Sequence, residues 1–210
     1  MFDQLELAGI PDSTLSKDHE NCEPILDKIW YKKKDVDKPF QTILEWMYKS
    51  PNEWARKGNF IIIDGGNHDQ RQMVLGIYLM RAIFANAKEQ GQIAKSVHVS
   101  EILTSLGSVN NMKLFAVSSF VAPPVLAIEE VDPSTFPSMS KDGGIFIDSL
   151  LIGRKKHGVP TLITLAVPYD HEDFFTYGRM FGGVFDSIIQ SNHSIEKGIL
   201  KIKLSGITEN

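Results

Sequence analysis

The chain has 210 residues, of which 42% are hydrophobic, and this suits one α/β domain with a buried core. Its formal net charge of −4 excludes binding of nucleic acid through overall positive charge and leaves only short basic clusters for that purpose. No apolar run reaches the roughly 18 to 20 residues that span a bilayer, and the acidic start lacks the features of a signal peptide. Because Cys22 is the single cysteine, no internal disulfide forms. We therefore expect a cytoplasmic protein with no membrane contact.

Residues 1–50 predict a helical lead-in before the main domain. Prolines separate short helical patterns there, and the pattern FQTILEWMYKS places apolar residues at helical spacing from Phe40. Six aromatic residues lie between positions 30 and 54, and aromatic anchors often dominate the energetics of interfaces. We expect 1–50 to be a candidate partner-binding segment and 51–210 to form the core.

Strand and helix signals alternate along the rest of the chain. Strand patterns occur at 60–63, 95–99, 125–128, 161–167 and 199–204. Helical patterns follow the first strand and then occur at 100–106 with Ser100 as the cap, at 145–156, and through most of 172–190. A polar loop with Gly143 and Gly144 is expected before the third of these. Because the strands are continuous apolar runs, we predict an α/β fold, a parallel sheet covered by helices on both faces.

The segment FIIIDGGNHDQRQMVLG has the layout of a phosphate-binding loop, with two glycines between a buried strand and a helix. The phosphate-loop pattern G-x-x-x-x-G-K-[ST] maps onto Gly65, Gly66, Asn67, His68, Asp69, Gln70, Arg71 and Gln72. Taken alone, however, the segment is more typical of an ordinary strand-to-helix turn.

The chemistry of this loop departs from the pattern. Gln70 replaces the second glycine and adds a side chain where backbone amides should approach a phosphate. Arg71 replaces the lysine, and its planar fork does not copy a compact ammonium. Gln72 lacks the hydroxyl that joins the Mg²⁺ shell, and Asp69 adds a negative charge. We therefore predict that tight Mg-ATP binding is lost.

A second signal lies about 60 residues downstream. The buried strand 125–128 ends in Glu129 and Glu130, which is the arrangement of a Walker B site. There the first acid holds Mg²⁺ and the second orients water. In an empty loop, we expect Arg71 to pair with Glu129 through charge-assisted hydrogen bonds.

From about residue 50 to 206 the chain resembles the DnaC/DnaI-type bacterial helicase loaders, which are AAA+ proteins related to the IstB-type transposition helper ATPases. Besides the two sites above, the resemblance rests on NEWARKGNFIIIDGG, IDSLLIGRKKHGVPTLITLAV and GILKIKLSG. It implies an AAA+-like P-loop core that acts in DNA replication. The implied partners are a replicative helicase or an AAA+ loader or initiator homologue, together with single-stranded DNA.

The departures from this family concentrate where ATP chemistry should occur. The family's sensor asparagine falls near Ala166, and its two trans-acting arginine positions hold Val184 and Ser187. The resemblance thus implies that Glu129 and Glu130 are vestigial. The compact basic cluster of the core, Arg154, Lys155 and Lys156, is the candidate contact for DNA.

Three functional hypotheses remain open. The first, which we prefer, is a loader-like pseudo-ATPase with no cofactor and no metal. The second is an unusual but active AAA+ ATPase of helicase-loading or transposition-helper type, which would bind ATP and Mg²⁺. The third is an unrelated α/β enzyme with a metal or acid–base site built from His68, Asp69, His98, Glu129 and Glu130, for which the sequence offers no fixed ligand spacing.

Overall fold

The computed structural model describes residues 60–68, 71–72, 75–76, 79, 94–102, 120–138, 141–192 and 198–204. The expected lead-in at 1–50 lies outside these residues, as do Asp69 and Gln70.

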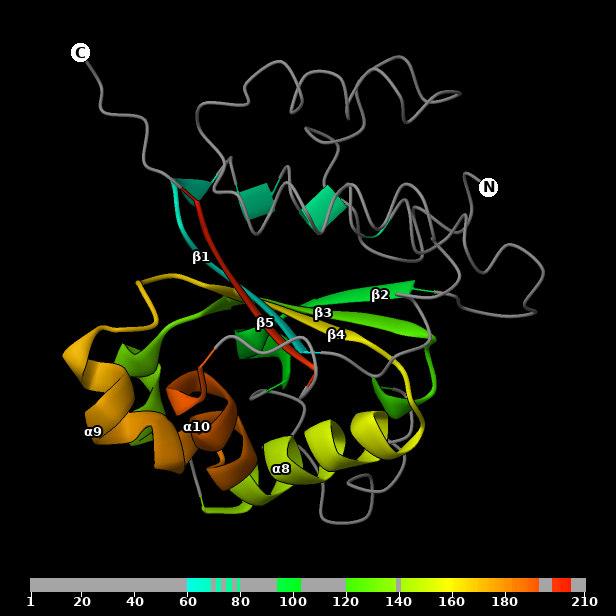
Figure 1. Cartoon of the computed structure of the whole chain (residues 1–210). Helices are drawn as coiled ribbons and strands as arrows, with labels where there is room; N and C mark the ends of the chain where they lie inside the picture. Colours follow the sequence, from blue (N-terminus) through cyan, green and yellow to red (C-terminus); the bar gives the residue numbers. More distant parts are fainter. Residues whose placement is uncertain are drawn as a thin grey trace, which may run out of the picture.

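The described core is built on one five-stranded sheet (Figure 1). Its strands are β1 (Phe60–Gly65), β2 (Ala94–His98), β3 (Val125–Val131), β4 (Thr161–Leu165) and β5 (Ile199–Leu204). They lie in the order β2-β3-β4-β1-β5, and every neighbouring pair is parallel. The predicted parallel α/β sheet is therefore confirmed, and β4 separates β1 from β3.

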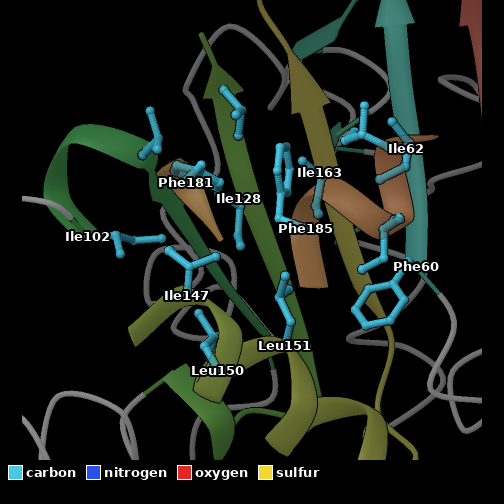
Figure 2. Packing of buried hydrophobic residues seen from close by; sticks show 14 of the residues in the cluster. Phe60, Ile62, Ile102, Ile128, Ile147, Leu150, Leu151, Ile163, Phe181 and Phe185 are labelled. Atoms are coloured by element: carbon cyan, nitrogen blue, oxygen red, sulfur yellow. The ribbon is translucent and has the colours of Figure 1, made fainter. Parts of the chain in front are cut away.

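Alternate residues of the strands pack on opposite faces of the sheet. Phe60 and Ile62 of β1 belong to the hydrophobic cluster under the later helices, and Ile128 of β3 joins them (Figure 2). Ile61 and Ile63 are equally buried but lie outside that cluster. Both faces of β1 are thus covered, which explains why this strand is apolar without alternation.

Three helices and a short 3₁₀ helix follow β3. They are η1 (Pro133–Ser138), α8 (Lys141–Lys156), α9 (Glu172–Phe181) and α10 (Gly183–Gln190). Figure 1 shows α8, α9 and α10 gathered on one face of the sheet, with the helical residues after β1 on the opposite face. Phe136 of η1 stacks on Phe181 with 4.6 Å between the ring centroids, which fixes η1 against α9.

Two expectations about helix boundaries are corrected. The predicted loop around Gly143 and Gly144 belongs to α8, which begins at Lys141. Gly144 allows α8 to approach α9 closely and does not mark a turn, because a side chain at 144 would lie 3.0 Å from the carbonyl oxygen of Met180. The helix after β2 already begins at Val99, so the cap is not Ser100. His98 takes that role, since its Nδ1 accepts the Ser100 backbone N–H at 3.1 Å.

The helical region 172–190 is divided at Gly182, which ends α9 and precedes α10. A Cβ at this position would lie 2.6 Å from Oδ1 of Asp148 on α8. Asp148 accepts the backbone N–H groups of Gly183 at 3.0 Å and Val184 at 2.7 Å. A carboxylate from α8 therefore caps the start of α10, and glycine leaves the space for it.

None of the described helices has the length and apolar character that a membrane span requires.

Candidate functional site

The candidate loop follows the carboxyl end of β1. Gly65 and Gly66 have φ angles of 71° and 63°, a left-handed conformation that glycine adopts without steric cost. The next helix contains His68, Arg71 and Gln72, and the backbone N–H of Arg71 bonds to the carbonyl oxygen of Asn67 at 3.1 Å. The two glycines turn the chain sharply, so that the first helical turn lies beside the ends of β3 and β4.

The end of β3 carries a β-bulge. Ile128 pairs with Ile163 of β4 and Val131 pairs with Leu165, so two residues of β3 lie opposite the single residue Thr164. Glu130 is in the bulge with a φ of 51°, a conformation that non-glycine residues rarely adopt. In a regular strand the consecutive acids Glu129 and Glu130 would point to opposite faces of the sheet. The bulge lets both side chains reach the helix that follows β1.

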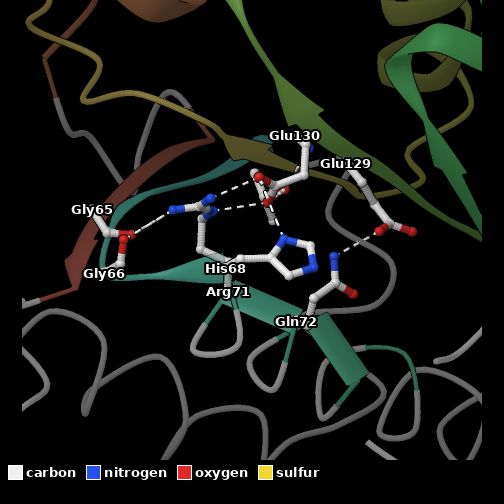
Figure 3. Close-up of polar contacts among 8 residues, drawn as sticks. Gly65, Gly66, His68, Arg71, Gln72, Glu129 and Glu130 are labelled. Carbon is white, nitrogen blue, oxygen red and sulfur yellow. Dashed lines mark hydrogen bonds and ion pairs between the residues drawn. The ribbon is translucent and has the colours of Figure 1, made fainter. Parts of the chain in front are cut away.

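Arg71 binds Glu130 through two parallel hydrogen bonds (Figure 3). Its Nε donates to Oε1 at 2.8 Å, and its Nη2 donates to Oε2 at 2.7 Å. Its Nη1 donates to the carbonyl oxygens of Gly66 at 2.9 Å and Gly65 at 3.5 Å. The arginine is only 7% exposed, and all three of its side-chain nitrogens are engaged within the protein. The expected pair with Glu129 is therefore wrong, because the bulge presents Glu130 to Arg71.

Glu129 instead belongs to a neighbouring polar contact. Gln72 donates from Nε2 to Oε2 of Glu129 at 2.9 Å, and Ser96 of β2 donates to the other carboxylate oxygen. Within the described residues no group donates to the buried Oε1 of Gln72. Gln72 thus uses its amide where the phosphate-loop pattern has a hydroxyl, and Glu129 is held by β2 and the helix together.

The surroundings of Glu130 favour its charged form. Partial burial by itself would raise the pKa of Glu130, but hydrogen bonds from Arg71 and the charges of Arg71 and His68 outweigh it, so the pKa is lowered. His68 lies at the rim, largely exposed, with Nδ1 3.7 Å from Oε2 of Glu130. The backbone N–H of Glu130 bonds to Oγ1 of Thr164 at 2.9 Å, which ties the bulge to β4.

The hydrogen-bonding groups of Arg71 are already used within the protein, so they do not face a ligand. A phosphate that approached Arg71 would meet a guanidinium already paired with a carboxylate and with two carbonyl oxygens. The described residues contain no cluster of three or more histidine, cysteine or acidic side chains that could hold a metal ion. His98, proposed for a metal or acid–base site, contacts Ser100 instead, whereas His68 lies beside Glu130.

The fold matches that of DnaI. A crystal structure of DnaI aligns with a TM-score of 0.54 and 15% sequence identity, over 80% of this chain and 86% of the DnaI chain. No known sequence family matches the chain, and the curated proteins contain no match either. At this identity the similarity establishes the fold alone, a DnaI-like α/β architecture built on a parallel sheet.

The residues at the expected sensor and trans-acting positions lie just after β4 and on α10. The backbone N–H of Ala166 bonds to the carbonyl oxygen of Val131 at 3.0 Å, just after β4. Val184 and Ser187 lie on α10, and Val184 donates its backbone N–H to Asp148. Arg179, at the end of α9, is largely exposed and lies 3.4 Å from Asp186.

The expected basic cluster is divided by the fold. Arg154 is 0% exposed, which contradicts its predicted role in DNA binding. Its guanidinium donates to Oγ1 of Thr161 at 2.8 Å and to backbone carbonyl oxygens before β3 and β4, which belong to Phe120, Val121, Pro123, Pro124 and Pro160. Lys155 and Lys156 are exposed at the end of α8. Of the three residues of the cluster, only these two lysines are therefore accessible to a phosphate.

Two residues of the site had no place in the sequence interpretation. Thr164 holds the backbone of Glu130, and Ser96 holds Glu129. Both lie within strands whose positions the sequence predicts. Their roles depend on the bulge and on the order of the strands, which no local pattern reports.

Proposed function

We propose that this chain is a helicase-loader-like protein of DNA replication that acts without ATP hydrolysis. It works through contacts with a replicative helicase or with an AAA+ loader or initiator homologue. The observation that carries the proposal is the bidentate pair of Arg71 and Glu130 at the phosphate-loop position of a DnaI-like fold.

The chemistry of the loop supports the loss of ATP hydrolysis. In a P-loop ATPase the cation of the loop binds the phosphates, while the acids of the neighbouring strand hold Mg²⁺ and position water. Here Arg71 and Glu130 neutralise one another, and Gln72 and Glu129 are bonded to one another. Each of these four side chains is thus bound to another of the four.

A role in DNA contact rests on a smaller surface. Lys155 and Lys156 lie exposed at the end of α8, and two lysines support a weak, salt-sensitive contact with a single strand. Since the net charge of the whole chain is −4, we expect DNA binding to assist the protein contact and not to replace it.

Binding to a purified replicative helicase tests the proposal. The full chain is immobilised, and the helicase and the AAA+ loader of the same cell are each passed over it without nucleotide. We expect micromolar or tighter binding to one of them, and a variant that lacks residues 1–35 should bind more weakly. If neither protein binds with or without ATP, the proposed function is wrong. Binding that requires ATP would favour the active-ATPase alternative.

A further inference from the structure

There are two different reasons why this loop would not bind a phosphate. Its residues could be unsuited to an oxyanion, or an anion of the protein could already fill the place. The two cases differ in whether removal of one group reopens the site. The contacts of Arg71 distinguish them.

The carboxylate of Glu130 contacts Arg71 as a bound oxyanion would. It engages Nε and Nη2 at 2.8 and 2.7 Å, which is the bidentate geometry that arginine uses for both carboxylates and phosphates. The third nitrogen, Nη1, is held by Gly66 and Gly65. The loop therefore keeps a buried, oriented cation that faces an anion.

The protein also holds Glu130 in an uncommon conformation to make this contact. A non-glycine residue with a φ of 51° is strained, and such strain persists only where the surroundings compensate for it. Thr164 fixes the backbone of the bulge, and Arg71 binds the side chain. Because the carboxylate is part of the chain, its effective concentration at Arg71 far exceeds that of a free phosphate.

We propose that Glu130 is a built-in anionic ligand of this loop, so that the loop excludes phosphate because it is occupied. The inference relies on the proposed function only for the assignment of the loop as a phosphate-loop counterpart. Removal of the carboxylate charge should then uncover an oxyanion site on Arg71.

Pyrophosphate binding by the full-length protein tests this, with the wild type, Glu130→Gln, Glu130→Gln combined with Arg71→Gln, and Glu129→Gln compared by calorimetry. Glu130→Gln should bind pyrophosphate at least tenfold more tightly than the wild type. The double variant should lose that gain, and Glu129→Gln, which alters the neighbouring acid, should show a smaller one. If Glu130→Gln is folded and binds no better than the wild type, the loop is unsuited to oxyanions and the inference is wrong.

Two further measurements guard against other outcomes. If Glu130→Gln does not fold, Glu130→Asp decides, because it keeps the charge but is one methylene too short for the same bidentate contact. It should bind pyrophosphate at least threefold more tightly than the wild type, and no gain would overturn the inference. Helicase binding by the same variants is recorded in parallel. Helicase binding without a gain in pyrophosphate affinity refutes this inference alone, and the reverse result refutes the proposed function alone.

Discussion

A guanidinium carries five N–H donors in one plane, and two such groups are buried among the residues that the structure describes. Arg154 bonds to Thr161 and to carbonyl oxygens from the segments that lead into β3 and β4. Arg71 bonds to a carboxylate and to the loop after β1. Arginine suits both places because a fixed fork can satisfy several acceptors at once. The basic run at 154–156 predicted a DNA contact for Arg154, and its burial reverses that interpretation.

Replacement of Arg154 tests its structural role. Arg154→Ala would leave several buried carbonyl oxygens without donors, so we expect the free energy of unfolding to fall by at least about 3 kcal/mol. The adjacent Lys155→Ala is the matched control, because Lys155 is exposed, and it should change stability by less than about 0.5 kcal/mol. Urea denaturation measures both variants. Equal stability of the two would contradict the burial of Arg154.

The pair of Arg71 and Glu130 makes stability depend on pH. The pKa of Glu130 is lowered from its ordinary value of 4.5, so its stabilising contribution is present above that value and is lost as the pH falls through the folded-state pKa. Glu130→Gln has no such titration. The wild type should therefore be more stable than Glu130→Gln at pH 7, by about 3 kcal/mol.

This difference should shrink as the pH falls below about 4.5. Urea denaturation of both proteins between about pH 7 and pH 3.5 gives the comparison. A difference that is already absent at pH 7, or that grows in acid, would show that the pair does not stabilise the folded state.

Among the elements, the five strands were predicted well and the bulge was not. β1, β3 and β4 follow from runs of apolar residues that are buried on both faces of the sheet, whereas β5 follows from an alternating pattern. The bulge in β3 places a glutamate in a left-handed conformation, and no glycine in the sequence marks it. The sequence therefore located Arg71 and both acids of the site, but it paired Arg71 with the wrong acid and missed Ser96 and Thr164.

The junction of α9 and α10, like the bulge, could not be predicted from local sequence. The sequence predicted helix through most of 172–190, whereas the division at Gly182 depends on Asp148, which lies 35 residues from Gly183 in the chain. Only the packing of α8 against α10 brings this carboxylate to the helix start. Long-range contacts of this kind are not visible in a local pattern.

The cap of α10 can be tested directly. Asp148→Ala removes the acceptor of two backbone N–H groups, so it should lower the free energy of unfolding by about 1 to 2 kcal/mol. Ser149→Ala, at the next position on α8, is the control, because Ser149 is exposed and bonds only within its own helix. A thermal unfolding midpoint that is equal for the two variants would refute the capping role.

For the whole molecule, the acidic balance and the two exposed lysines of α8 predict weak binding of single-stranded DNA. Charge reversal at both Lys155 and Lys156 should abolish that binding while the domain stays folded. In the wild type, the salt dependence should correspond to about two phosphate contacts. Arg179→Glu, which reverses the charge of a single exposed residue on α9, is the control. Fluorescence anisotropy with a labelled oligonucleotide measures all three, and unchanged binding in the double variant would place the DNA contact elsewhere.

We propose that this DnaI-like fold acts without nucleotide, because Arg71 is paired with Glu130 and Gln72 with Glu129 at the position of the phosphate loop. Calorimetric titration of the full chain with Mg-ATP tests this most directly. We expect a dissociation constant weaker than about 100 µM, which is less than about 5.5 kcal/mol of binding. A saturable isotherm in the low micromolar range would contradict it and would favour an active ATPase.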